Sequence, residues 1–408
     1  MNDPDVPDTP TPPAEPGTVE PAALAEALAA GESVRLLDVR DRDAVDRWRI
    51  EGAAVTATQV PYAKFMAAAV GDEVGDLAAD VAGEGPVTVV CGRGEASGYV
   101  AGVLTAAGVE ARNLAGGMEA WGRVHLARVV RRDPTVVQYE RPATGCLSYA
   151  ALDGGEALLV DPLLAGVGEY RRDLAERGAD LVAVLDTHLH ADHLSGLREL
   201  TAGDSDAGGA GGTPRRLLPA GVGRRGVTDA GGTLDDGDTL TVGGATVEAV
   251  ALPGHTTEMT GLVVGDVLVA GDSLFLDGVA RPDLQEGVDP RDQADQLYET
   301  LHDRLEAVSG DPLVAPGHRR PETGLPDGTY TARLSALRER VEALGLDRAA
   351  FLERVLSDTA RPANAERILA VNRGTETIET GDDGSEEWVE LELGPNNCAA
   401  SATPEGAR

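Results

Sequence analysis

The chain has 408 residues and a formal net charge of −34, from 35 basic and 69 acidic residues. The length exceeds that of one ordinary domain, so we expect two domains with tails. The charge argues against nucleic acid as a partner, because binding it requires basic patches. Lys64 is the only lysine. An acidic, lysine-poor surface suits a salt-rich cytoplasm, where screening suppresses self-repulsion, and therefore predicts a halophilic source.

Residues 1–16 are rich in Pro and Asp, which predicts a disordered leader without the apolar segment of a signal peptide. No apolar run is long enough to span a membrane, so we expect a cytoplasmic protein with no membrane partner. Cys91, Cys146 and Cys398 lie far apart and indicate no disulfide framework. Neither Cys146 nor Cys398 belongs to a motif, and we predict no role for them.

Residues 17–125 alternate strand and helix patterns, which predicts an α/β domain with a parallel sheet and flanking helices. The expected elements are a helix over Glu20–Ala30, strands over Val34–Val39 and Val87–Val90, and a helix over Ala101–Ala107.

Cys91 follows the second of these strands directly and opens a glycine-rich loop before the helix. The loop residues are Gly92, Arg93, Gly94, Glu95, Ala96 and Ser97. Backbone N–H groups wrapped around the sulfur, together with a helix N-terminus, would lower a thiol pKa and stabilise a persulfide. The alternative is a buried cysteine with only a structural role.

The unit resembles the rhodanese domain from about Thr18 to Val124. The resemblance depends on the Cys91 loop and on three further segments, Asp38–Arg40, Trp48–Ala53 and Leu114–Trp121. It implies that Cys91 carries a sulfane sulfur as a persulfide. Two departures are Arg49, where many relatives have His, and Glu95 followed by Ala96, where a polar or basic residue is frequent. An acidic side chain there should weaken the binding of thiosulfate.

A second pattern covers residues 130–325. Hairpins are expected around Asp153–Gly155, Gly243–Gly244 and Gly265–Asp266, and a buried strand over Leu181–Leu185 leads into a histidine-rich segment. A helical extension over 326–378 and an acidic disordered tail over 379–408 complete the expected organisation. Thr201–Thr213 has the composition of a flexible insertion.

Four residues of ligand type fall within six positions after that strand: His188, His190, Asp192 and His193. A strand end followed by a loop can direct several of them at one ion, and their imidazole and carboxylate groups suit zinc, iron or manganese. The alternative is a solvated polar loop.

Three further candidates each end a short apolar strand and follow a glycine that lets the backbone pass close to an ion. These candidates are His255, Asp272 and His318. Each is a weak signal alone, but their order and flanking residues make them a strong set.

The seven positions together resemble the metallo-β-lactamase superfamily from about Val130 to Arg320. The resemblance implies a four-layer αββα sandwich with the metal at one edge of two sheets. In its dizinc hydrolases all seven positions bind metal, whereas in its persulfide dioxygenases the counterparts of His188, His255 and Asp272 alone hold one Fe(II). Two histidines and one carboxylate leave open positions on iron for a substrate sulfur and O2. His190, Asp192 and His193 would then orient ligands or water.

Arg281 and Asp283 follow a glycine-containing turn after Asp272. Their spacing looks like the persulfide dioxygenase pattern and predicts a substrate-binding pair. The alternative is an ion pair at the surface.

These features predict an enzyme that oxidises a low-molecular-weight thiol persulfide with O2 to sulfite, with one Fe(II) in each metal domain. Cys91 and Asp192 are the expected catalytic residues, and Cys91 would exchange sulfane sulfur with the same pool. One alternative is a glyoxalase II-like thioester hydrolase with two Zn(II). A second is a sulfur carrier or sensor with a structural metal. Dimers are common among the proteins that it resembles, and the sequence leaves open whether this chain is a monomer or a homodimer.

Overall fold

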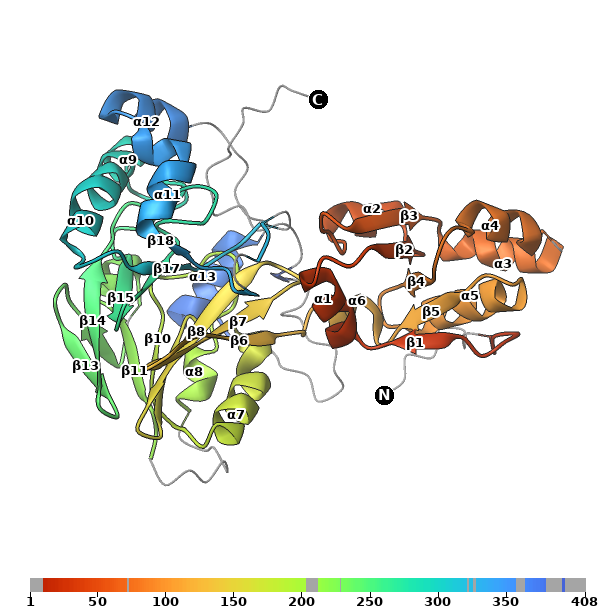
Figure 1. Ribbon diagram of the computed structural model, residues 1–408, viewed down its shortest axis with the longest axis horizontal. Helices are drawn as coiled ribbons and strands as arrows, with labels where there is room; N and C mark the ends of the chain where they lie inside the picture. The colour runs from red at the N-terminus through yellow and green to blue at the C-terminus, as the bar shows by residue number, and fades with distance from the viewer. Residues whose placement is uncertain are drawn as a thin grey trace. The chain divides into compact units, whose positions relative to one another are not determined.

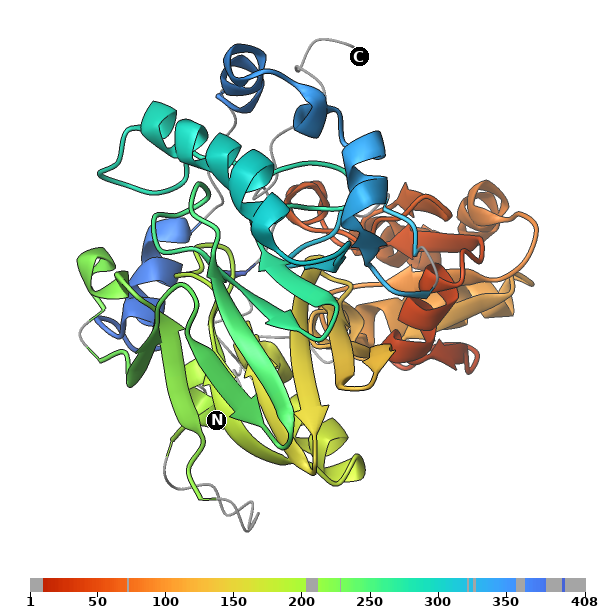
Figure 2. The ribbon, with the colours of Figure 1, turned by 60° about the vertical axis from the view of Figure 1, so that its left-hand side comes forward.

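The computed structural model describes residues 10–71, 73–202, 212–227, 229–320, 323–325, 328–356, 364–378 and 391–392. Most of the predicted leader, insertion and acidic tail lies outside these residues. The chain divides into two compact units, Met1–Leu126 and Ala127–Arg408, which Figures 1 and 2 show in two orientations.

The first unit contains a five-stranded parallel sheet in the order β1-β5-β4-β2-β3. Its strands are β1 (Gly17–Val19), β2 (Val34–Asp38), β3 (Val55–Gln59), β4 (Val87–Val90) and β5 (Ala111–Leu114). Its helices are α1 (Pro21–Ala29), α2 (Arg42–Arg47), α3 (Tyr62–Gly71), α4 (Val74–Val81), α5 (Glu95–Ala106) and α6 (Gly117–Trp121). The predicted α/β architecture is confirmed. All four residues of β4 are buried, as a continuous Val-rich run predicts for a strand covered on both faces.

The second unit contains two sheets. The seven-stranded sheet has the order β12-β11-β10-β9-β8-β7-β6 and the six-stranded sheet the order β13-β14-β15-β16-β17-β18. The first comprises β6 (Leu126–Arg132), β7 (Thr135–Arg141), β8 (Cys146–Asp153), β9 (Glu156–Val160), β10 (Asp180–Leu185), β11 (Arg215–Pro219) and β12 (Gly232–Leu234). The second comprises β13 (Thr239–Val242), β14 (Ala245–Ala251), β15 (Thr260–Val264), β16 (Val267–Gly271), β17 (Leu313–Pro316) and β18 (Ala332–Arg333).

Helices cover the outer faces of both sheets (Figure 1). Those beside the seven-stranded sheet are α7 (Val167–Glu176), α8 (Leu197–Leu200) and α13 (Ala365–Arg373), and those beside the six-stranded sheet are α9 (Pro290–Glu299), α10 (Leu305–Ala307), α11 (Leu334–Arg340) and α12 (Arg348–Val355). The layers follow from the alternation of side chains along each strand. In β9, Leu158 and Val160 join the core between the sheets, whereas Ala157 and Leu159 pack in the cluster that contains Tyr170 of α7. The predicted αββα sandwich is confirmed.

The predicted helical extension over 326–378 is not one continuous helix where the structure describes it. A 3-10 turn over Glu342–Gly345 separates α11 from α12. The Asp347 side chain accepts a hydrogen bond from the Ala350 N–H and caps the start of α12, a position where Asp is favoured because it satisfies a free backbone donor. The apolar periodicity of the sequence gives no sign of the turn at Glu342–Gly345, and the new helix begins at the Asp347 cap.

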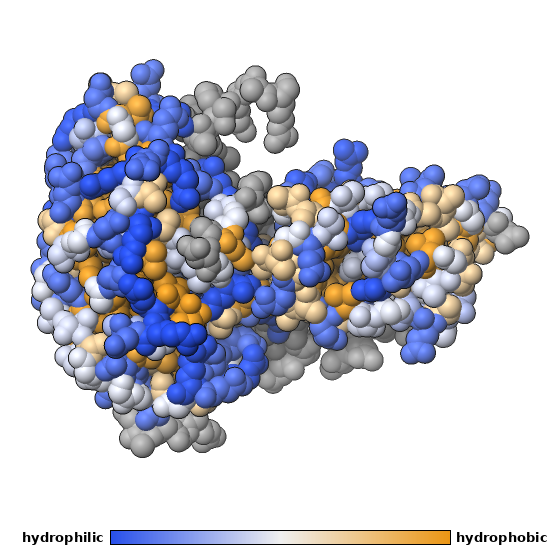
Figure 3. Space-filling model, in the orientation of Figure 1, coloured by the Kyte–Doolittle hydropathy of each residue, from blue (hydrophilic) through white to orange (hydrophobic). Residues whose placement is uncertain are grey.

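Hydrophilic residues spread over much of the visible face in the surface view (Figure 3). Within the described part of the chain, Val70 is the large hydrophobic residue that stands exposed. No helix among the described residues is both long and apolar enough to cross a bilayer.

Candidate metal centre

The predicted ligands come from loops that follow four strands of the second unit. The loop after β10 carries His188, the loop after β14 carries His255, and Asp272 and His318 follow β16 and β17. A Cβ atom on Gly317 would lie 2.4 Å from Asp272 Oδ1. Glycine at this position therefore permits the close backbone approach that the sequence predicts.

Three of the ligands form one compact, buried group. Asp272 Oδ2 lies 3.9 Å from His188 Nε2 and 3.8 Å from His255 Nε2. This oxygen is buried and has no hydrogen-bond partner among the described residues. His255 Nδ1 lies 3.0 Å from the Arg281 carbonyl oxygen and His188 Nδ1 lies 3.0 Å from Thr187 Oγ1. Each ring is therefore held by one nitrogen while the other faces Asp272, the donor set that a single metal ion requires.

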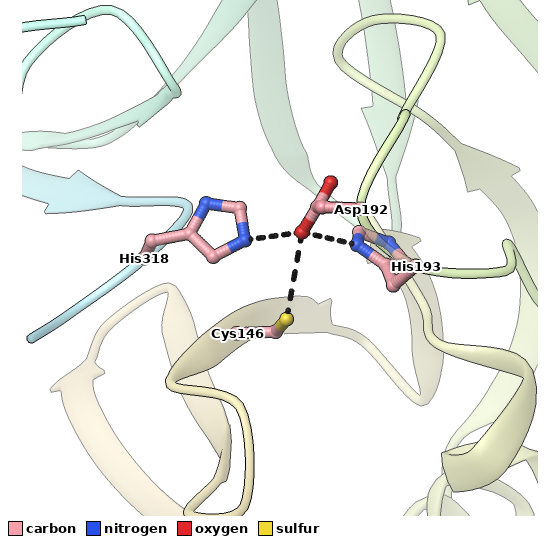
Figure 4. A group of neighbouring side chains, drawn as sticks. All are labelled: Cys146, Asp192, His193 and His318. Carbon is pink, nitrogen blue, oxygen red and sulfur yellow. Dashed lines mark hydrogen bonds and ion pairs between the residues drawn. The ribbon is translucent and has the colours of Figure 1, made fainter. Parts of the chain in front are cut away.

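A second group, formed by Cys146, Asp192, His193 and His318, includes a thiol (Figure 4). Asp192 Oδ2 is its centre, at 2.9 Å from His318 Nε2, 3.3 Å from His193 Nδ1 and 3.8 Å from Cys146 Sγ. The ligand atoms of these four residues all lie within 4.8 Å of one another. His318 also connects the groups, because its Nδ1 lies 2.6 Å from Asp272 Oδ1.

The two groups differ in charge. Burial lowers the pKa of His188 well below its usual value and also lowers the pKa of His255. Burial acts the same way on His193 and His318, but the carboxylate of Asp192, and for His318 also that of Asp272, raises their pKa well above the usual value. Without metal, the first group therefore offers neutral imidazoles and the second forms ion pairs.

His190 belongs to neither group. Its Nε2 lies 3.0 Å from Asp161 Oδ1, and Asp186 completes a third buried cluster with them. Asp161 also accepts hydrogen bonds from the Thr187 N–H at 2.6 Å and Thr187 Oγ1 at 2.8 Å. The structure thus holds His190 through Nε2 in a network with Asp161, while its ring centroid lies 4.1 Å from those of His188 and His193. Its Nδ1 is buried and has no hydrogen-bond partner among the described residues.

Asp161, Asp186 and Cys146 were not among the predicted site residues. Burial raises the pKa of Asp186 to about 6. Burial also acts to raise the pKa of the Cys146 thiol, but nearby His318 and His193 outweigh it and lower this pKa to about 7. The only signal for Asp161 in the sequence is its position at the end of β9, next to the strand that precedes the histidine segment. The antiparallel bridge between Cys146 and His318 joins residues that no local pattern connects.

Arg281 and Asp283 form an ion pair, but not at the surface. Arg281 is 1% exposed, and its guanidinium donates to both carboxylate oxygens of Asp283, at 3.0 and 2.7 Å. The same residue's backbone carbonyl holds His255. The pair therefore fixes the segment that orients a ligand of the first group.

In the first unit, the Cys91 loop has the predicted arrangement. Cys91 Sγ accepts a hydrogen bond from the Gly94 N–H at 3.1 Å and lies 3.1 Å from Ser97 Oγ, and α5 begins at Glu95. Arg93 points to the exposed Glu119 carboxylate at 2.9 Å. Cys91 is 6% exposed, and its sulfur lies in the loop that leads into α5.

Comparisons with known proteins agree with the two units. The model of the metallo-beta-lactamase superfamily matches residues 141–318 and that of the rhodanese-like domain matches residues 20–123. The mitochondrial persulfide dioxygenase of Homo sapiens is 32% identical over 168 residues, which are 40% of this chain and 59% of that relative. The chain thus spans less than two thirds of this relative.

The hydroxyacylglutathione hydrolase of Methylococcus capsulatus is 34% identical over 212 residues, which are 50% of this chain and 75% of that relative. Among solved structures, a metallo-beta-lactamase from Staphylococcus aureus gives a TM-score of 0.51 at 21% identity, covering 58% of this chain and 72% of the other. That structure supports the fold alone. The chain therefore belongs to the metallo-beta-lactamase superfamily, with a rhodanese-like domain before the metal-binding fold.

Proposed function

We propose that the second unit is an iron-dependent dioxygenase for the persulfide of a low-molecular-weight thiol. The observation that carries this proposal is the group formed by His188, His255 and Asp272. Two imidazole nitrogens and one carboxylate oxygen are the ligands of mononuclear Fe(II) enzymes that activate O2. Iron bound there would supply positions for a substrate sulfur and O2 side by side.

The reaction balances without another reductant. A persulfide RSSH, O2 and H2O give RSH and sulfurous acid, which ionises to sulfite. The terminal sulfur loses four electrons to O2, its bond to the carrier sulfur breaks, and the carrier leaves as a thiol. The residues around the metal hold its ligands and exclude bulk water, since every member of the first group is buried.

A cavity of about 280 Å³ beside Ala191 of the metal-binding loop offers room for the carrier. Its other lining residues are Leu284, Glu286, Asn364, Ala365, Glu366 and Leu369. Among the described residues the lining is mainly apolar, with two carboxylates and no Lys or Arg, so we expect a carrier that presents an apolar or cationic group here.

We propose further that Cys91 exchanges sulfane sulfur with the same persulfide pool. A persulfide on Cys91 would receive the hydrogen bond from Gly94 that its thiol now accepts. Attack by a thiolate on the outer sulfur breaks the S–S bond, transfers that sulfur as RSSH and restores the Cys91 thiolate. Two centres on one chain then share one intermediate at a raised effective concentration.

The second candidate function is thioester hydrolysis with two zinc ions. The group of Cys146, Asp192, His193 and His318 favours it, because thiol, carboxylate and imidazole groups are the side chains that bind zinc. This group also lies beside the first one. A metal-bound hydroxide would then be the nucleophile. The similar hydroxyacylglutathione hydrolase supports the same alternative.

Metal analysis of protein purified without O2, combined with O2 uptake on a persulfide, separates the two functions. We expect one iron per chain and O2 consumption that matches sulfite formation. Two zincs per chain, with thioester cleavage and no O2 uptake, would refute the dioxygenase. The rate of O2 uptake is then compared between persulfides whose carrier thiols do and do not bear carboxylates. Faster uptake with the carriers that lack carboxylates would support the expected class of carrier.

A further inference from the structure

The C-terminal part of the chain holds the backbone of the metal-binding loop. We call α13 together with Leu391 and Glu392 the C-terminal clasp. Asn372, on α13, donates from Nδ2 to the carbonyl oxygens of His190 and His193, at 3.0 and 2.9 Å. Its Oδ1 accepts a hydrogen bond from the Ser195 N–H at 3.0 Å. One side chain thus satisfies three backbone groups of the loop.

Glu392 makes the next contact along the same loop. Its Oε1 accepts a hydrogen bond from the Leu194 N–H at 2.7 Å, and its Oε2 pairs with Arg141. The side chains of this ion pair are 2% and 1% exposed. Arg141 begins a turn that is closed by a hydrogen bond from the Gly145 N–H to the Arg141 carbonyl oxygen at 2.8 Å. Cys146 follows this turn directly. Glu392 therefore connects the histidine loop to the turn that carries the thiol of the second group.

An apolar contact supports these hydrogen bonds. Leu194 of the loop, Ile368 of α13 and Leu391 form one buried cluster. Leu391 and Glu392 fall within the segment for which the composition predicts an acidic disordered tail, yet both are 5% exposed. At these positions the tail is part of the interior. Leu391 packs in the apolar cluster, and the Glu392 carboxylate neutralises the buried guanidinium of Arg141.

We infer that Asn372 and Glu392 are positioning residues that act through the loop backbone on His188, the ligand of the first group that this loop carries. The loop has no strand partner between His190 and Leu194, so its backbone polar groups need partners from elsewhere. The clasp supplies partners at three of these residues, His190, His193 and Leu194, and at the adjacent Ser195. Hydrogen-bond partners that orient the residues binding a metal contribute to metal affinity as well as to folding. Their loss typically weakens metal binding about 10–100-fold. The inference depends on the proposed metal site but not on the reaction performed there.

Titration of the metal-free full chain with Co(II) tests the inference. Asn372→Ala removes three hydrogen bonds to the loop. Glu392→Gln keeps an acceptor for Leu194 but removes the charge that faces Arg141. The matched control is Glu376→Gln, in an ion pair with Arg367 whose side chains are both 39% exposed. We expect Co(II) affinity to fall about 10–100-fold in the first two variants, with a changed visible ligand-field spectrum, and to stay unchanged in the control.

Melting temperatures of metal-free and Co(II)-loaded protein separate positioning from mere stability. A positioning role predicts a smaller metal-induced rise in melting temperature in the two clasp variants. If both variants lose stability yet bind Co(II) with wild-type affinity and spectrum, the inference is wrong. If Asn372→Ala fails to fold, Asn372→Ser, which keeps a donor and an acceptor, takes its place. A wild-type chain that binds metal but does not oxidise persulfide would refute the proposed function and leave this inference standing.

Discussion

Replacing Asp283 with asparagine removes the carboxylate that faces the buried Arg281 while keeping the side-chain volume. The side chains of the pair are 2% and 26% exposed. Breaking a fully buried ion pair costs about 3–5 kcal/mol, because a charge is left in the interior without its counter-charge. Since a quarter of Asp283 remains in contact with water, which screens part of the interaction, we expect a loss of about 2–3 kcal/mol in the free energy of unfolding.

Hydrogen exchange of peptides from the second unit, followed through a urea titration of metal-free protein, measures this loss in the unit concerned. The matched control is Glu169→Gln, in an ion pair with Arg172 whose side chains are 35% and 63% exposed. We expect the control to change the free energy of unfolding by no more than about 0.5 kcal/mol. If Asp283→Asn has an effect as small as the control, Arg281 does not depend on Asp283 and the reasoning fails.

The remaining predictions concern the two centres and the pH dependence of stability. Cys91→Ser should abolish sulfane sulfur transfer to a thiol but leave persulfide-dependent O2 uptake; loss of both would contradict two separate centres. His255→Ala should abolish iron binding, whereas His193→Ala should retain it, as metal analysis would show; the opposite result would assign iron to the second group. Asp186 has a pKa of about 6 against an ordinary 3.8. The folded protein therefore binds more protons between these values, and stability falls as pH rises through them. The whole fall is about 3 kcal/mol, of which about 2 kcal/mol lies between pH 4.5 and pH 7. Asp186→Asn should remove this fall, which urea unfolding of metal-free protein at pH 4.5 and pH 7 would measure; an equal fall in both proteins would refute it.

The sequence by itself predicted both folds, the second through its resemblance to the metallo-β-lactamase superfamily, and it singled out the candidate residues of both sites. The alternation of apolar strands and helices was sufficient for the parallel sheet, and a buried strand that runs into Cys91 placed this thiol at a helix N-terminus. The spacing of His188, His190, Asp192 and His193 identified a metal-binding loop, because four ligand-type side chains within six residues after a strand have few other uses. These signals come from residues that are close together in the sequence, so the geometry of one strand, helix or loop is enough to determine where their side chains lie.

Only the tertiary structure decided how the ligands divide. His188 and His190 are two residues apart, yet one faces Asp272 and the other faces Asp161, because the loop turns between them and strand ends distant in sequence meet it there. Cys146 enters the second group through its bridge to His318. Glu392 is buried in a segment whose composition predicts solvent exposure, because a guanidinium far away in sequence requires a counter-charge in the interior. Such pairings depend on which chain segments the fold brings together, and no spacing along the chain encodes them.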